Sequence, residues 1–358
     1  MDILEPGTED AVSCKSQLLI TTHSPHILYE RGFRPIRYFR RSTAGAHQSS
    51  EVLNLSGFYN ATEPSIRDFL ERYMKLTHCD LFFADAAVLV EGNVERLLIP
   101  QMIEKTAPLL KSACLSILEV GGGFGYRFRT LIEFLGLTTL IVTDIDSVLP
   151  PATPAAGDTA VDDDEEEDEE RVMPKSGSAC AVMEPGALTS NQTLIQWLPG
   201  CNTIAELLAA TAERRTQAPD GDSHAHILVA YQGASSITWR GTTLSLAGRT
   251  LEESFALENL AWCQDRAQKD IQLRIPKNDT KDLGELARAI HNRVKGSGFK
   301  KTDFALALLT REPESWIVPG YIADGLRWLE NVVTPPDAPV AIPALAAAVA
   351  PALQEAGQ

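Results

Sequence analysis

Short continuous runs of apolar residues recur along the chain, separated by segments whose apolar positions repeat at helical spacing. The runs at residues 86–90 (AAVLV) and 138–143 (TTLIVT) are typical of strands buried on both faces of a sheet. Further strands are predicted at residues 17–21, 115–120 and 225–230. Helices are predicted at residues 65–76, 95–110 and 128–135, and the patterns of residues 193–211 and 251–292 are mostly helical.

This alternation of strand and helix with short connections predicts an α/β fold. The sheet is expected to be mostly parallel and flanked by helices, and the later helical segments are expected to form an additional helical subdomain. Hydrophobic residues make up 44% of the chain, which is enough for a sizeable core and excludes a disordered protein.

Acidic residues follow two of the predicted buried strands. Glu91 comes directly after residues 86–90, and Glu95 lies one helical turn later on the same face. Asp144 and Asp146 follow residues 138–143 and point to the same side of an extended chain. Four carboxylates at one edge of a parallel sheet repel one another unless cations lie between them, and Mg²⁺ prefers such oxygen ligands. Each motif alone also fits a helix-dipole partner or a plain turn; their shared position after buried strands favours a metal site.

The charge of the chain first argues against a nucleic-acid-binding protein. There are 48 acidic and 32 basic residues, and the formal net charge is −16. Ten acidic residues and no basic one fall within residues 158–170, so a long acidic disordered loop is predicted at about 149–180, and the rest of the chain carries a net charge of −6. The candidates for contact with DNA phosphates are Arg34, Arg37, Arg40, Arg41, Lys295 and Lys300. For the four arginines, an interface with another domain is an equally good interpretation.

Other classes of protein find no support in the sequence. No apolar run approaches the roughly 20 residues that a membrane-spanning helix needs, and the N-terminus does not resemble a signal peptide. The six cysteines are scattered without a CxxC pair, which argues against structural zinc and against a disulfide framework. We therefore expect a cytoplasmic protein with no membrane partner.

Several ordered motifs resemble a known family. Leu89-Val-Glu-Gly92 with Asp144-Ile-Asp146 resembles the Toprim domain of topoisomerases, primases and some nucleases. Further stretches at residues 90–95, 121–123, 189–191, 249–252 and 301–305 narrow the resemblance, over about residues 15–330, to the OLD (overcoming lysogenisation defect) ATP-dependent endonucleases. The resemblance implies an ABC-type ATPase remnant at 1–50, a helical connector at 51–80, a Toprim nuclease domain at 81–330 with a helical insertion at about 190–295, and a Pro/Ala-rich tail at 331–358.

The resemblance also implies roles for individual residues. Glu91, Glu95, Asp144 and Asp146 match the family's metal ligands, and two divalent ions, Mg²⁺ or Mn²⁺, would assist hydrolysis of DNA phosphodiester bonds. Ser147 and Glu252 are further candidate ligands, with Glu253 as the alternative to Glu252. Lys301 is expected to steady charge on the scissile phosphate, with Lys300 as its competitor.

The N-terminal motif of the chain resembles the last conserved segment of ABC-type ATPases. In Gln17-Leu-Leu-Ile-Thr-Thr-His23-Ser-Pro25, a strand precedes a switch histidine, His23. No phosphate-binding GxxxxGK[ST] loop is present, so ATP is expected to act only in a full-length protein, whose N-terminal ATPase domain would be the partner of this part and the route to a homodimer. The family resemblance implies roles in phage defence or DNA repair.

Two other functions remain open. Asp144-Ile-Asp-Ser-Val148 also fits the DxDx[TV] motif of HAD-type phosphatases, in which the first aspartate is a nucleophile. The domain could instead be a DNA-binding scaffold without catalysis.

Overall fold

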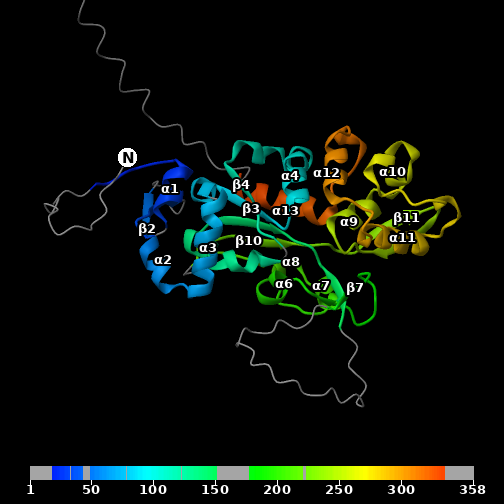
Figure 1. Ribbon diagram of the computed structural model, residues 1–358, viewed down its shortest axis with the longest axis horizontal. Helices are drawn as coiled ribbons and strands as arrows, with labels where there is room; N and C mark the ends of the chain where they lie inside the picture. The colour runs from blue at the N-terminus through cyan, green and yellow to red at the C-terminus, as the bar shows by residue number, and fades with distance from the viewer. Residues whose placement is uncertain are drawn as a thin grey trace, which may run out of the picture.

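A five-stranded sheet forms the centre of the protein (Figure 1). The computed structural model describes residues 18–32, 34–42, 49–77, 79–121, 123–150, 177–220 and 223–334. The sheet has the order β4-β3-β5-β10-β9, and its strands are β3 (Ala86–Val90), β4 (Leu115–Glu119), β5 (Thr138–Val142), β9 (Thr216–Gln217) and β10 (Ile227–Ala230). The first four strands in this order are parallel, and β9 is antiparallel to β10. The predicted mostly parallel α/β fold is confirmed.

Strand β3 is buried along its whole length because helices cover both faces of the sheet. On one face, Val88 and Val90 belong to the core with α4 (Asn93–Thr106) and α13 (Gly320–Val333). On the other face, Leu89 packs in the core of α3 (Pro64–Thr77) and α5 (Arg129–Leu135). Successive side chains of a strand point to opposite faces, so a fully apolar run such as residues 86–90 requires cover on both sides.

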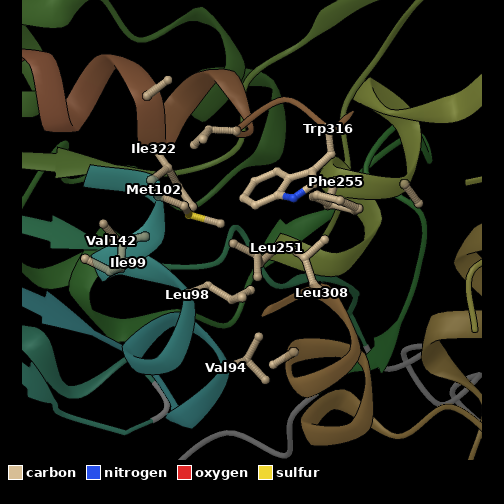
Figure 2. Packing of buried hydrophobic residues seen from close by; sticks show 14 of the residues in the cluster. Val94, Leu98, Ile99, Met102, Val142, Leu251, Phe255, Leu308, Trp316 and Ile322 are labelled. Carbon is tan, nitrogen blue, oxygen red and sulfur yellow. The ribbon is translucent and has the colours of Figure 1, made fainter. Parts of the chain in front are cut away.

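A helical lobe extends the first of these cores beyond the sheet. It consists of α9 (Leu251–Glu258), α10 (Leu260–Gln264), α11 (Leu283–Lys295) and α12 (Lys301–Leu309), with the hairpin β11 (Ser235–Trp239) and β12 (Thr242–Leu246). Figure 2 shows Phe255 of α9, Leu308 of α12 and Trp316 packed toward Leu98 and Met102 of α4. This packing fixes the first turns of α9 and α12 beside the first turn of α4.

The remaining elements lie around this framework. The N-terminal part contains α1 (Pro25–Arg31), the hairpin β1 (Arg37–Ser42) and β2 (Ser49–Asn54), and α2 (Leu55–Ala61). A small antiparallel sheet is formed by β6 (Ser147–Leu149), β7 (Ser178–Ala179) and β8 (Leu188–Thr189), followed by α6 (Gln192–Gln196), α7 (Ile204–Ala209) and α8 (Ala212–Arg215). Among the described residues, no helix is long and apolar enough to cross a membrane.

Two expectations differ from the structure. The strand predicted at residues 17–21 is wrong for the described residues 18–21, which are extended, form no ladder and expose Leu18 and Leu19 by 70% and 82%. A strand needs a neighbouring strand to satisfy its backbone groups, and no described strand pairs with this segment. The insertion expected to be helical at about 190–295 also contains the β11–β12 hairpin, whereas its strand β10 is the one predicted at residues 225–230.

Two of the expected domain boundaries fall inside elements of the structure. The β1–β2 hairpin joins residues on both sides of the division expected at residue 50. Helix α13 continues to Val333, past the expected start of the tail at 331. The acidic run at 158–170 and most of that tail lie outside the described residues.

Gly325 allows α13 to lie close to the sheet, and this gives a test of the packing. A Cβ atom there would lie 2.9 Å from Leu140 Cδ1 and 3.3 Å from Ala230 Cβ, whereas one at Gly57 of α2 would meet nothing within 4 Å. We expect Gly325→Val to lower the free energy of unfolding by about 1–3 kcal/mol through overpacking. Gly57→Val should change it by about 0.5 kcal/mol or less. Urea denaturation of both variants measures this, and equal midpoints would contradict the assigned packing.

Candidate active site

The predicted acidic residues meet at the carboxyl ends of the parallel strands. Glu91 directly follows β3, and Asp144 follows its neighbour β5 by two residues. Gln232 stands in the same position after β10, which is the next strand. Ligands of parallel α/β sheets bind at this edge. The sheet therefore places these three side chains together without any help from the connecting helices.

Glu91 is held by a set of hydrogen-bond donors. Its Oε1 atom accepts from the Thr143 hydroxyl, from Asp144 N at 3.1 Å and from Asn191 Nδ2 at 2.7 Å. Asn191 Nδ2 also donates to the carbonyl of Asp144 at 2.8 Å. Since Asn191 is the N-cap residue of α6, the start of that helix fixes Glu91 relative to the Asp144 backbone.

Glu95 lies in the first turn of α4 and is buried. Its Oε2 atom accepts from Gly92 N at 3.1 Å, which caps the helix. A carboxylate at this position also interacts favourably with the helix dipole. The capping role and the predicted role as a metal ligand are compatible, because the cap uses one of the two oxygens.

The two aspartates of the DxD motif are held differently. Asp144 is buried, and its Oδ1 atom accepts from Gln232 Nε2 at 2.6 Å and from Leu251 N at 3.0 Å. Asp146 has a positive φ of 45°, and its Oδ1 atom forms an ion pair with Arg249 Nη2 at 2.8 Å. The turn at Asp146 therefore directs its carboxylate toward a cation of the segment that precedes α9.

Glu252, rather than Glu253, faces these carboxylates. Glu252 is fully buried, and its Oε2 atom accepts from Thr250 Oγ1 at 2.7 Å. Its Oε1 atom accepts no hydrogen bond of suitable geometry, although Lys301 Nζ lies 3.2 Å away. Glu253 is engaged elsewhere, with Arg249 N at 3.0 Å and His291 Nδ1 at 3.0 Å.

Lys301 is likewise distinguished from its neighbour. Its ammonium group pairs with Glu252, and its side chain remains 52% exposed. Lys300 Nζ instead donates to the carbonyl of Ser297 at 3.2 Å. One lysine therefore lies between the carboxylates and the solvent, while the other contacts the loop before α12.

Burial and mutual repulsion raise the pKa values of the site carboxylates. Burial, together with Asp146 and Glu95, raises the pKa of Glu91 to about 7, against hydrogen bonds that lower it. Burial and then Glu91 and Glu95 hold the pKa of Asp144 well above its ordinary value. The pKa of Glu95 is raised by burial and by Glu252. These groups therefore lie in one electrostatic field and resist simultaneous ionisation.

The same negative charges stabilise the protonated form of Lys301. Burial alone would lower the pKa of Lys301, but Glu252, Asp144 and Glu95 raise it above the ordinary value. The ammonium group therefore stays charged and compensates part of the negative charge of the site.

The donor set fits a hard divalent cation. Within the described ranges, no three His, Cys, Asp or Glu side chains already enclose a point that could hold a metal ion. The oxygen of Glu252 that lacks a hydrogen bond and the mutually raised pKa values of Glu91, Glu95 and Asp144 indicate a cluster that a cation would stabilise.

Ser147 and His23 lie differently from the main cluster. Ser147 is buried, and its hydroxyl donates to the carbonyl of Cys180 at 2.7 Å. His23 is exposed and lies beside Phe83, with a distance of 5.9 Å between ring centroids. Neither side chain is brought to the carboxylates by a described contact.

The predicted DNA-binding residues are dispersed and mostly engaged within the chain. Arg34 lies over the Tyr59 ring, Arg37 donates to the carbonyls of Arg34 and Ile36, and Arg40 pairs with Glu51. Lys295 donates to the carbonyl of Ala179 at 2.6 Å. The side chain of Arg41 lies outside the described structure.

Three functional side chains had no predicted role. Asn191, Gln232 and Arg249 contact Glu91, Asp144 and Asp146 respectively. Asn191 and Arg249 belong to stretches that carried the family resemblance, and Gln232 follows a predicted strand. The position after a buried strand, which singled out Glu91, is the feature that would also have identified Gln232.

Comparisons with known proteins agree with this arrangement. Residues 82–146, which contain Glu91 and both aspartates, match the family described as overcoming lysogenization defect protein-like, TOPRIM domain. The endonuclease GajA of Bacillus cereus (strain HuB5-5) is 26% identical over 336 residues, or 88% of this chain and 42% of the relative. GajA of Bacillus cereus (strain VD045) is 29% identical over 130 residues, or 36% of this chain and 20% of that relative. The chain thus spans less than half the length of these relatives.

Two solved structures are similar to part of the chain. They are the C-terminal region of the Burkholderia pseudomallei OLD protein, with a TM-score of 0.32 and 16% identity, and that of the Xanthomonas campestris pv. campestris OLD protein, with 0.29 and 18%. Each comparison covers 70% of this chain, and 99% and 97% of the respective structures. The segment that carries the carboxylates at the ends of β3 and β5 thus matches the Toprim domain of proteins similar to OLD.

Proposed function

We propose that this chain is the nuclease part of a metal-dependent DNA endonuclease that hydrolyses phosphodiester bonds. The observation that carries the proposal is the cluster of buried carboxylates that raise one another's pKa at the carboxyl edge of the sheet, with Lys301 on its solvent side. The curated relatives are named endonucleases. The chain spans only part of the length of these relatives. The proposal therefore also includes ATP use by an ATPase domain, a homodimer through that domain, and roles in phage defence or DNA repair.

The ligands in this proposal are carboxylates from three segments of the chain. Glu91, Glu95, Asp144, Asp146 and Glu252 would hold two divalent ions, Mg²⁺ or Mn²⁺. Such ions supply activation of a water molecule and stabilisation of charge on the phosphate oxygens. Ser147 stays a candidate only if its hydroxyl leaves the carbonyl of Cys180.

The chain's own residues orient these ligands and the substrate. Thr143 and Asn191 hold one oxygen of Glu91, and Gln232 with Leu251 N holds one oxygen of Asp144. Each contact fixes the rotamer of a ligand and leaves its second oxygen available, as expected of groups that orient metal ligands. Lys301, which is half exposed and charged, would stabilise a phosphate oxygen as negative charge develops.

The phosphatase alternative has less support. It requires Asp144 to attack phosphorus as an ionised nucleophile. Burial and the neighbouring glutamates raise the pKa of Asp144, which disfavours that ionised form in the absence of cations. Trapping of a phospho-aspartate on Asp144 would nevertheless revive this alternative. A non-catalytic scaffold has less support, because it gives no reason for a cluster of carboxylates whose mutual repulsion destabilises the fold.

We expect Asp144→Asn to abolish cleavage of supercoiled plasmid DNA in Mg²⁺ or Mn²⁺, with a loss of at least about 100-fold. The reason is that the amide replaces a charged ligand while keeping its shape. Asp324→Asn is the matched control, because Asp324 is an exposed residue of α13 that pairs with Arg327. Gel analysis of nicked and linear products measures both variants. Full nicking by Asp144→Asn would refute the proposed nuclease site.

Lys301→Ala should lower the cleavage rate by about 10²–10³-fold, because the variant lacks the cation beside Glu252. Lys300→Ala should keep most of the activity, since its ammonium group contacts Ser297. Single-turnover cleavage at saturating protein separates this effect from weaker DNA binding. Equal losses in the two variants would contradict the distinct placement of these lysines.

Metal-free stability provides a test that does not depend on activity. Burial and then Asp146 raise the pKa of Glu91 from its ordinary value of 4.5 to about 7, so its protonated form stabilises the fold at low pH. This contribution is lost as the pH rises from about 4.5 to 7. Relative to the wild type, Glu91→Gln should therefore gain stability over that window. One pKa unit corresponds to about 1.4 kcal/mol, which gives a gain of about 3 kcal/mol at most.

Denaturant titration in EDTA at pH 5 and pH 8 measures this gain. Addition of Mg²⁺ at pH 8 should stabilise the wild type more than Glu91→Gln, because the wild type retains a carboxylate ligand. A stability difference that is independent of both pH and Mg²⁺ would contradict the prediction.

A further inference from the structure

Arg127 lies in an aromatic environment next to the active site. It belongs to the short 3₁₀ helix Phe124–Phe128 that follows β4. Its guanidinium carbon is 4.9 Å from the ring centroid of Phe69, 5.1 Å from that of Phe124 and 6.0 Å from that of Tyr126. Its Nε atom donates to the Tyr126 hydroxyl at 3.3 Å. Aromatic rings therefore fix the plane of this guanidinium.

No described carboxylate forms an ion pair with Arg127, in contrast to nearby arginines. Arg129 pairs with Glu133 at 3.0 Å, and Arg249 pairs with Asp146 at 2.8 Å. Glu63 accepts hydrogen bonds from Ser65, and these are the main cause of the lowered pKa of Glu63. The charge of Arg127 lowers this pKa only as a minor contribution. The described residues thus leave the terminal nitrogens of Arg127 without an acceptor, and these nitrogens are not among the buried polar atoms without a partner. They face solvent.

Phe124 gives the same turn an exposed apolar surface. Its side chain is 39% exposed, although a ring of this size normally gains free energy from burial. An exposed aromatic ring beside a guanidinium that lacks an acidic partner is the combination that binds single-stranded nucleic acid, because bases stack on the ring and phosphates bind the cation.

The turn that carries both residues is tied to the carboxylate site. Gly121 N donates to the carbonyl of Glu91 at 3.0 Å, and Phe124 N donates to that of Gly121 at 3.0 Å. Gly123 has φ +73°, and a Cβ atom there would lie 3.0 Å from Asn191 Oδ1, so the turn packs on the asparagine that holds Glu91. A ligand on Phe124 and Arg127 would therefore lie in a fixed relation to the carboxylates.

We propose that Phe124 and Arg127 form a binding site for an unpaired segment of the nucleic-acid substrate. A base stacks on Phe124, and an adjacent phosphate accepts hydrogen bonds from Arg127. The inference deepens the proposed nuclease function by naming the substrate feature that this edge of the active site recognises. It also supplies a phosphate contact that is absent from the set predicted from charge clusters.

Equilibrium binding of a fluorescent oligo-dT 20-mer and of a 20-base-pair duplex, both in EDTA, tests the proposal. Arg127→Ala should weaken binding of the 20-mer by at least about 10-fold and reduce the slope of log K against log[salt] by about 0.7, the value for one phosphate contact on a single strand. Phe124→Ala should weaken binding of the 20-mer about 10-fold and binding of the duplex by less than about 2-fold. Phe124→Trp should retain binding of the 20-mer.

Two matched variants control for general effects. Arg129→Ala removes a surface arginine that has an acidic partner, and Phe39→Ala removes an aromatic ring that is 65% exposed on β1. Both should bind the 20-mer like the wild type. The proposal is overturned if Arg127→Ala and Arg129→Ala bind alike, if Phe124→Ala weakens duplex and single strand equally, or if the wild type does not bind the 20-mer.

The binding measurement is separate from the nuclease proposal. Binding that depends on Phe124 and Arg127, in a wild type that cleaves no DNA in Mg²⁺ or Mn²⁺, supports the strand site and refutes the nuclease. Cleavage by the wild type with unchanged oligonucleotide binding by both variants supports the nuclease and refutes the strand site.

Discussion

The repulsion between carboxylates at the ends of β3 and β5 is the constraint on which the rest of this structure depends. The strands are parallel neighbours, so Glu91 and Asp144 meet whatever the connecting segments do. Their raised pKa values reflect the burial and mutual repulsion of these carboxylates, which disfavour their ionised forms. The fold offsets part of this cost with Lys301 and Arg249, which pair with the nearby Glu252 and Asp146. Positive charge at this edge thus stabilises the folded carboxylate cluster, whatever further role it has.

The segments that supply these compensating groups lie far along the chain from the strands. Asn191 precedes α6, Gln232 follows β10, and Arg249 and Leu251 begin α9. Packing of α9 and α12 on α4 (Figure 2) holds their first turns at the site. The helical lobe therefore completes the candidate site that the sheet begins, and the apolar core of the lobe positions these side chains.

The sequence predicted the features that depend on local pattern. The apolar runs at 86–90 and 138–143 identified β3 and β5, and the acids that follow them identified the carboxylate cluster. Features that depend on distant contacts were missed. Nothing local shows that Glu252 faces Lys301 while Glu253 faces His291, or that Gln232 bonds Asp144. The strand expected at 17–21 failed for a related reason: an apolar pattern specifies a strand only where a partner strand is present.

The acidic composition of the chain is compatible with binding of nucleic acid because charge acts locally. Ten of its acidic residues lie in 158–170, outside the described structure, and the site carboxylates are a charge that divalent ions would neutralise. What matters for a phosphate is a cation whose hydrogen-bond donors are not already used. Most arginines predicted from charge clusters are engaged, as Arg40 is with Glu51. Arg127 lies among aromatic rings, and its side-chain hydrogen bond uses Nε, so its terminal nitrogens keep their donors available among the described residues. In the proposed strand site, the aromatic neighbours of Arg127, more than the net charge of the chain, would therefore decide where a phosphate binds.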